Sequence, residues 1–156
     1  MSLLSEIIVG GIGGLIGAIA MSSVMLVGKQ LGFVRTPVPN KIVRSLESRT
    51  EIVETTSPSE ETILAQGIHL GIGGVYGLGY GLLRKLLRAP GILLGPLYGL
   101  GIYIFNEIFA GPALKLTPKP ENERPITVAR RVFMHVLYGF SLYLVSERLS
   151  RGISSR

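Results

Sequence analysis

Two histidines and a glutamate fall within or at the edge of long apolar stretches of this sequence. Each stands in a different stretch, and they are His69 in 62–84, Glu107 in 90–110 and His135 in 127–148. An imidazole ligates metals and titrates near neutral pH, and a carboxylate can share either task. The three side chains therefore indicate haem binding, metal binding or proton transfer if the fold brings them together.

Three chemistries and one structural role are open for these side chains. Two histidines on facing helices could be both axial ligands of haem b. With Glu107 they form an acceptable ligand set for zinc, manganese or iron, and all three could instead relay protons. In the structural alternative each histidine hydrogen-bonds a neighbouring carbonyl or carboxylate, and Glu107 forms an ion pair with Arg130 or Arg131. The sequence leaves the cofactor and any metal unknown, with haem b as the cofactor that this pattern could hold.

The chain lacks the residue patterns of the common catalytic classes. It has no cysteine, which excludes disulfides, thiolate catalysis and zinc–cysteine sites. It shows no nucleophile–base pair, no paired carboxylates and no phosphate-binding loop, because the glycine-rich run 71–77 follows no predicted strand. We therefore expect a protein that is not an enzyme.

The composition is typical of a membrane protein. Of the 156 residues, 47% are hydrophobic and 17% are charged, and the mean hydropathy is +0.45. The charges avoid the apolar stretches, each of which is about long enough to cross the hydrocarbon core of a bilayer as a helix. We predict an all-α, four-helix transmembrane bundle formed by a single integral membrane domain. The domain covers 1–156, its polar loop covers 28–61, and its spans cover 3–27, 62–84, 90–110 and 127–148.

The basic charge of the chain points to lipid rather than to nucleic acid. The formal net charge is +6, and the Lys and Arg residues gather at the ends of the apolar stretches, where anionic lipid headgroups would meet them. We therefore expect the lipid bilayer as a partner and no nucleic acid. The expected location is a bacterial or archaeal cell membrane.

Glycines recur at spacings of four, or close to it, in the first three apolar stretches. In lipid such rows of small residues let helices approach closely, whereas in a bare helix each glycine costs up to about 1 kcal/mol relative to alanine. The rows predict a homo-oligomer or a subunit of a larger membrane complex. The predicted helix-packing positions are Gly10, Gly14, Gly17, Gly67, Gly71, Gly73, Gly77, Gly81, Gly91, Gly95 and Gly99.

Local signals place the helix ends. Ser57 is a good N-cap and the proline after it suits the first helical position, so the second helix should begin there. In the polar loop, the two prolines of 36–40 disfavour a helix, and 41–49 is predicted as a short helix whose Ile42, Val43 and Leu46 lie on the membrane surface. The other expected helices are Pro58–Leu87, Pro90–Ala110 with a stop at Gly111-Pro112, and Pro125–Leu149.

Two short patterns occur twice. TPVPN at 36–40 follows the first apolar stretch, and TPKPEN at 117–122 follows the third. The second and fourth stretches each carry a histidine and then Tyr-Gly. These patterns predict a tandem repeat of a two-helix hairpin, with the two copies related by an axis along the membrane normal. In that arrangement His69 and His135 enter the bilayer from the same side at similar depth, and Glu107 reaches this level from the opposite side.

Several of these residues resemble the YagU-like family of bacterial inner-membrane proteins of unknown function. The resemblance covers about 67–149 and rests on His69 with Gly79-Tyr80, on Glu107 with Pro112 and Leu116-Thr117-Pro118, and on His135 ahead of an arginine-closed helix end. It implies an inner-membrane location and a loose link to acid resistance. The chain departs from the family at Glu107, where a histidine is expected, and at Arg131, where an acidic residue is expected.

Two functions of different class follow. The first is a small accessory or interaction subunit, or a homo-oligomer, packed through glycine-rich helix faces. The alternative is an intramembrane polar site formed by His69, Glu107 and His135, which would bind haem b or a divalent metal or handle protons in acid stress.

Overall fold

The computed structural model describes residues 2–32, 38–48, 57–87 and 89–154, and all regular structure in these residues is helical. The elements in chain order are α1 (Leu3–Gln30), α2 (Val38–Glu47), α3 (Pro58–Leu87), α4 (Gly91–Tyr103), the π-helix η1 (Ile104–Ala110), α5 (Gly111–Ala113), the 3-10 helix η2 (Pro120–Asn122) and α6 (Pro125–Ser154). The predicted all-α class is therefore confirmed.

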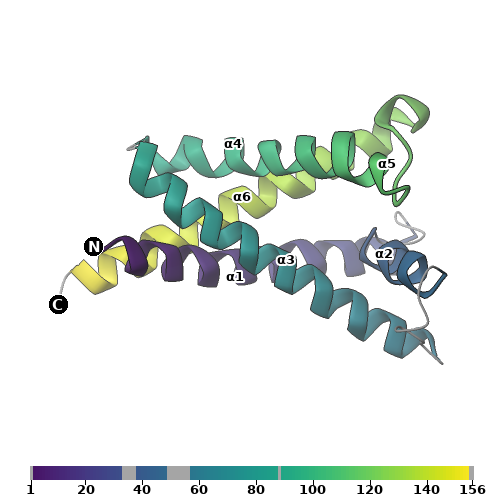
Figure 1. Ribbon diagram of the computed structural model, residues 1–156, viewed down its shortest axis with the longest axis horizontal. Helices are drawn as coiled ribbons and strands as arrows, with labels where there is room; N and C mark the ends of the chain where they lie inside the picture. Colours follow the sequence, from purple (N-terminus) through teal and green to yellow (C-terminus); the bar gives the residue numbers. More distant parts are fainter. Residues whose placement is uncertain (1, 33–37, 49–56, 88, 155–156) are drawn as a thin grey trace.

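The long helices form an elongated bundle (Figure 1). α1 packs extensively on both α3 and α6, and α4 packs on α6, whereas α3 and α4 touch only sparsely. The two chain ends lie at one end of the bundle, and α2 lies at the other end against α3 (Figure 1). The buried core draws on all four long segments, through Ala18, Tyr80, Leu94, Ile102, Tyr138 and Leu142.

The start of α3 follows the capping signal in the sequence. The helix covers Pro58–Leu87 as predicted, and the backbone N–H of Glu60 donates to Ser57 Oγ at 3.3 Å. The fourth long helix also begins at the predicted residue, Pro125, but it continues to Ser154 rather than ending at Leu149.

The short helix in the loop differs from the prediction. α2 begins at Val38, three residues earlier than expected, and ends at Glu47. Pro39 does not prevent the helix because it lies in the first turn, where its missing N–H would have had no partner in the helix. Val43 is fully buried rather than lying on a membrane surface, since α2 packs on α3. Thr36, Pro37 and Arg49 of these predictions lie outside the described residues.

The third long segment does not stop where the sequence suggested. After α4 the helical path becomes the π-helix η1 and then continues through α5 to Ala113. Pro112 does not end the path, which continues past it to Ala113. The path ends before Lys115, whose φ of 57° is the left-handed conformation typical of a helix end.

Two helices of the described residues are long and apolar enough to cross a membrane, Leu3–Gln30 and Gly91–Ala113. The other predicted spans, 62–84 and 127–148, lie in α3 and α6, which are not in this pair. Glycines and a histidine lower the mean hydropathy of α3, and charged side chains lower that of α6. A bundle of four spans therefore stays a prediction.

Candidate functional site

Glycines bring the backbones of α1 and α3 into direct contact. Gly77 lies between Gly10 and Gly14, and a Cβ built on Gly77 would lie 2.8 Å from Gly14 Cα and would strike the Gly10 carbonyl oxygen. One turn along, a Cβ on Gly81 would lie 2.8 Å from the carbonyl carbon of Glu6. Any side chain at these positions would force the two helices apart.

α4 and α6 cross in the same way. Gly139 lies between Gly95 and Gly99, and a Cβ built on it would lie 3.0 Å from the Gly99 nitrogen and would strike the Gly95 carbonyl oxygen. A Cβ on Gly99 would in turn strike the carbonyl oxygen of His135. The backbone of His135 is therefore part of this crossing.

The two crossings share one register. Gly77 faces two glycines spaced four apart on α1, Gly139 faces two glycines spaced four apart on α4, and both follow a tyrosine. This is the arrangement expected of a repeated hairpin, with α1 and α3 as one copy and α4 and α6 as the other. We call the alignment of Gly77 with Gly139, and of Gly10 with Gly95, the aligned register.

The two histidines do not correspond in the aligned register. His69 stands seven residues before Tyr76, whereas His135 stands three residues before Tyr138. His69 therefore corresponds to Arg131, and it lies one helical turn, about 6 Å, further from its crossing than His135 does. The sequence pattern that paired the histidines misses this offset.

Glu107 is paired with an arginine. Its Oε2 lies 3.0 Å from Arg131 Nη1, and Arg131 Nη2 donates to Glu123 Oε1 at 2.8 Å. The side chains of Glu107, Arg131 and Glu123 are 6%, 13% and 15% exposed, so one cation lies between two carboxylates in a largely buried cluster. The predicted ion pair between Glu107 and Arg131 is confirmed.

The two histidines differ in their hydrogen bonds. His135 Nδ1 lies 2.8 Å from the carbonyl oxygen of Arg131 one turn earlier, and its ring packs edge-on against Tyr103 with the ring centres 5.6 Å apart. His69 Nε2 is buried and has no hydrogen-bond partner among the described residues. The structural alternative is therefore met at His135, but this nitrogen of His69 does not meet it among the described residues.

A haem site stays a prediction, and the described residues offer no cluster of metal ligands. The described part of the chain holds no group of three or more histidine and acidic side chains placed to bind a metal ion. Two cavities of about 400 and 650 Å³ open on the surface, and neither is lined by a histidine. The charged side chains hold helices together through ion pairs. Because ionisable groups buried in a membrane protein often mark proton pathways, proton transfer is a chemistry that they could perform.

Tyrosines supply hydrogen bonds between helices that the sequence did not reveal. Tyr138 Oη donates to the Gly73 carbonyl oxygen at 2.6 Å and joins α6 to α3. Tyr76 Oη donates to Asn106 Oδ1 at 2.6 Å and joins α3 to η1. The signal that could have found them is that each tyrosine directly precedes a crossing glycine, where another helix is within reach.

A second cluster of one arginine between two carboxylates lies on the side of the chain termini. Arg84 Nη2 lies 3.2 Å from Glu147 Oε2, and Arg84 Nε lies 3.9 Å from Glu6 Oε2. Arg84 Nη1 also donates to Ser150 Oγ at 3.2 Å. This cluster ties α3 to α1 and α6, and the sequence did not predict it because its members are far apart along the chain.

The predicted packing glycines divide into two groups. Most contact another helix, including Gly73 on Ala18 and Gly17 on Tyr138. A Cβ added at Gly67 or Gly71 would meet no atom within 4 Å among the described residues. These two glycines of α3 therefore take no part in packing inside the described chain.

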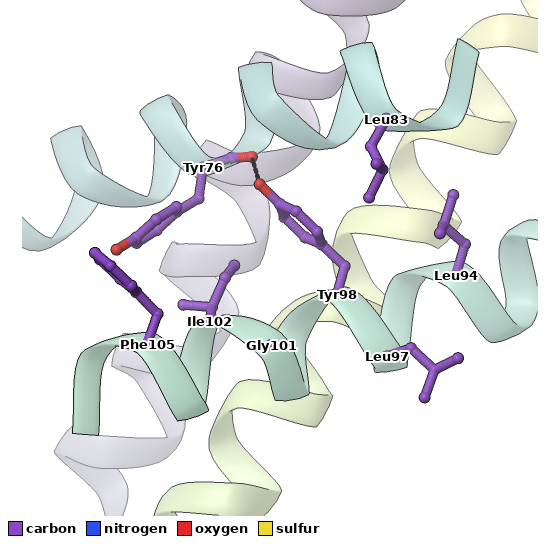
Figure 2. Close-up of a pocket in the computed structure, with 8 residues that line it drawn as sticks. All are labelled: Tyr76, Leu83, Leu94, Leu97, Tyr98, Gly101, Ile102 and Phe105. Carbon is purple, nitrogen blue, oxygen red and sulfur yellow. Dashed lines mark hydrogen bonds between the residues drawn. The ribbon is translucent and has the colours of Figure 1, made fainter. Parts of the chain in front are cut away.

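A groove runs between α3 and α4, where these helices touch only sparsely (Figure 2). Its volume is about 400 Å³. Figure 2 shows the Tyr98 side chain reaching from α4 across this space to the backbone of α3. The lining residues are Tyr76, Leu83, Leu94, Leu97, Tyr98, Gly101, Ile102 and Phe105.

Comparisons with known proteins place the chain in one family. The searches of curated proteins and of solved structures each gave no match. The comparisons do not link the chain to the YagU-like family in particular. The match that was found covers residues 4–155, nearly the whole chain, and on this ground the protein belongs to a family of unknown function, DUF6789.

Proposed function

We propose that this protein is an integral membrane protein of four spans that acts by associating, through α3, with a second copy of itself or with a larger membrane complex. The observation that carries the proposal is a face of α3 that no part of the described chain covers. This open α3 face consists of Ile63, Gly67, Gly71 and Val75, spaced four residues apart. Ile63 is 72% exposed and Val75 is 66% exposed.

The surface of the bundle supports a position in a bilayer. Two of its helices are long and apolar enough to cross a membrane. Large apolar side chains of all four long segments are exposed, and in water so many of them would be costly. In both charge clusters an arginine is paired with carboxylates of other segments, as expected for ionisable groups in or near the hydrocarbon core.

The cost of glycine explains why the open α3 face favours a partner. Each glycine inside a helix costs up to about 1 kcal/mol relative to alanine. At Gly73 and Gly77 the close packing of helices offsets this cost. Gly67 and Gly71 have no such contact within the described chain. A helix from another chain could approach α3 closely at these two glycines and offset their cost in the same way.

The test is the oligomeric state of the full-length protein in mild detergent, measured by light scattering with the detergent mass subtracted. We expect the wild type to be larger than one chain, and Gly71→Leu to reduce it to one chain. Gly101→Leu is the matched control, because Gly101 is an equally open glycine that lies on α4 and outside the open α3 face. A wild type that is monomeric and cross-links to nothing in its own membrane would contradict the proposal, and so would a Gly71→Leu variant that keeps its size.

A second candidate function is proton handling at the cluster of Glu107, Arg131 and Glu123. Two observations favour it: the cluster is largely buried, and Glu107 lies on a π-helix, which is frequent at functional sites. The acid-stress role implied by the YagU-like resemblance agrees with it. In vesicles holding a pH-sensitive dye, Glu107→Gln should abolish proton flux, and a wild type without flux rules this candidate out.

A further inference from the structure

Three buried polar atoms on the side of the chain termini have no hydrogen-bond partner among the described residues. They are Glu6 Oε2 of α1, Tyr80 Oη of α3 and Ser146 Oγ of α6. Tyr80 is fully buried, and Ser146 is 1% exposed. Buried polar groups are costly without a partner, and native proteins leave few of them unpaired. A hydrogen-bonding molecule bound between the helices would explain all three.

The packing on α1 places the three side chains close together along the bundle. A Cβ added at Gly81, the residue after Tyr80, would lie 2.8 Å from the carbonyl carbon of Glu6. Ser146 Oγ would lie 2.7 Å from a Cβ added at Gly13. Gly13 stands seven residues after Glu6, which is about two turns of α1. The three helices therefore present their unpaired atoms within about two turns of one another.

Charged groups border the same part of the bundle. The Tyr80 hydroxyl lies within electrostatic reach of Arg84 and Glu6. Arg84 Nε lies 3.9 Å from Glu6 Oε2, which is too far for a direct hydrogen bond but within the span of a bridge through one water molecule. α3 and α6 each pack on α1 and do not pack closely on one another, so side chains alone connect them at this level.

The charges select a small neutral molecule that both donates and accepts hydrogen bonds. An anion would meet the carboxylates of Glu6 and Glu147, and a metal cation would meet the guanidinium group of Arg84. An ionised carboxylate only accepts hydrogen bonds, whereas the hydroxyls of tyrosine and serine can donate or accept. Water satisfies this combination, and a buried water molecule typically makes about three hydrogen bonds.

We propose that a small cluster of ordered water lies between α1, α3 and α6 and hydrogen-bonds Glu6 Oε2, Tyr80 Oη and Ser146 Oγ. The water bridges Glu6 to Arg84 and extends the polar cluster around Arg84 into the bundle. The site lies inside one copy of the chain, so it does not depend on the proposed association through α3.

The test is hydroxyl-radical labelling of the full-length protein in mild detergent, with the radicals made by a short X-ray pulse. X-rays split water wherever it lies, so a side chain that touches bound water is oxidised even when it is buried. Tyr138 is the matched control, because it is 4% exposed and its hydroxyl donates to the Gly73 carbonyl oxygen at 2.6 Å. Mass spectrometry should show that Tyr80 is oxidised several-fold faster than Tyr138. Equal rates would overturn the water site.

Variants test the shared water by stability. Tyr80→Phe and Ser146→Ala should each lower the unfolding midpoint, because each removes a hydroxyl that is bonded to water. The double variant should lower it by less than the sum of the two single shifts, since both hydroxyls bond the same cluster. Midpoints that rise in both single variants would show that the hydroxyls are dry and would overturn the proposal. Strictly additive shifts would overturn the shared cluster.

Discussion

The two hairpins of this bundle share a backbone crossing but differ in the polar groups beside it. In the first hairpin Gly77 of α3 lies between two glycines of α1, and in the second Gly139 of α6 lies between two glycines of α4. About two turns from the crossing glycine, the second hairpin holds Arg131 between two carboxylates, whereas the corresponding position of the first hairpin is His69. The crossing is thus common to both, and an arginine at this position belongs to the second hairpin alone, since the first carries its arginine, Arg84, at the other end of α3.

The glycine crossings stabilise the fold in both hairpins, whereas the charge cluster could give the second hairpin a function of its own. Backbone contact through glycine depends only on shape, so it works equally in both hairpins. A buried ion pair is a poor source of net stability, because desolvation of the charges offsets their attraction. The asymmetric placement of the charge cluster therefore suggests a role particular to the second hairpin, and variants of each hairpin can test the comparison.

The largest effect is expected from side chains placed in the crossings. Gly77→Leu should lower the free energy of unfolding by about 3 kcal/mol or more, because its side chain would overlap the α1 backbone. Gly139→Leu should do the same to α4. The measurement is the unfolding midpoint in mild detergent titrated with a denaturing detergent. Gly101→Leu is the control and should not lower the free energy of unfolding, because no described atom lies within 4 Å of a Cβ added at Gly101. If only one of the crossing variants is destabilised, the two hairpins are not equivalent.

A smaller effect should follow from removing the cation of the second hairpin. Arg131→Gln leaves the buried carboxylate of Glu107 without its partner and should cost about 3 kcal/mol. His69→Gln, at the corresponding position, should cost less than about 1 kcal/mol, because His69 Nε2 has no hydrogen bond among the described residues to lose. The same unfolding titration measures both.

The double variant Arg131→Gln with Glu107→Gln tests whether the cost of Arg131→Gln comes from the unpaired Glu107. If the cost of Arg131→Gln is the cost of an unpaired buried carboxylate, removing that carboxylate should restore part of the stability. A double variant as unstable as the sum of the single variants would show that the two side chains act independently, against the contact between them at 3.0 Å.

The sequence predicted what depends on local signals or on charge. The bounds of α3 follow from Ser57 and Pro58, and the pairing of Glu107 with Arg131 follows from the need of a buried carboxylate for a cation. The π-helix could not be predicted, because its hydrogen-bond pattern has no simple sequence signature. Nor could the sequence separate Gly67 from Gly77, since both belong to rows of similar spacing, and only the neighbouring helix decides which of them is covered.

The histidines show a second limit of sequence patterns. The repeat of a histidine followed by Tyr-Gly predicted two equivalent side chains, but the register of a helix pair is set by which residues touch. Once Gly77 and Gly139 define the alignment, His69 corresponds to Arg131. The different spacing of histidine and tyrosine can be read from the sequence, but the glycine that marks the crossing cannot, because the glycine rows repeat about every four residues.

The smallest expected effect concerns an acidic residue in the first turn of α3, Glu61. In the aligned register Glu61 corresponds to Glu123, but Glu61 binds across to α2, where Asn40 Nδ2 donates to its Oε1 at 3.0 Å and Arg44 Nε donates to the same oxygen at 3.1 Å. Partial burial raises the pKa of Glu61, but the hydrogen bonds from Asn40 and Arg44 outweigh it, so the pKa lies below its ordinary value of 4.5. The charged carboxylate is therefore favoured in the folded state.

The sign of the pH dependence follows. A carboxyl group with a lowered pKa in the folded state stabilises it fully above the unfolded value, and this contribution disappears as the pH falls below 4.5 through the lower folded value. Because Arg44 is largely exposed, the effect should stay below about 1 kcal/mol. Unfolding midpoints measured from about pH 7 to about pH 3 should fall more for the wild type than for Glu61→Gln, which carries no charge to lose. Parallel curves would mean that the contact of α2 with α3 depends on the packing of Val43 rather than on charge.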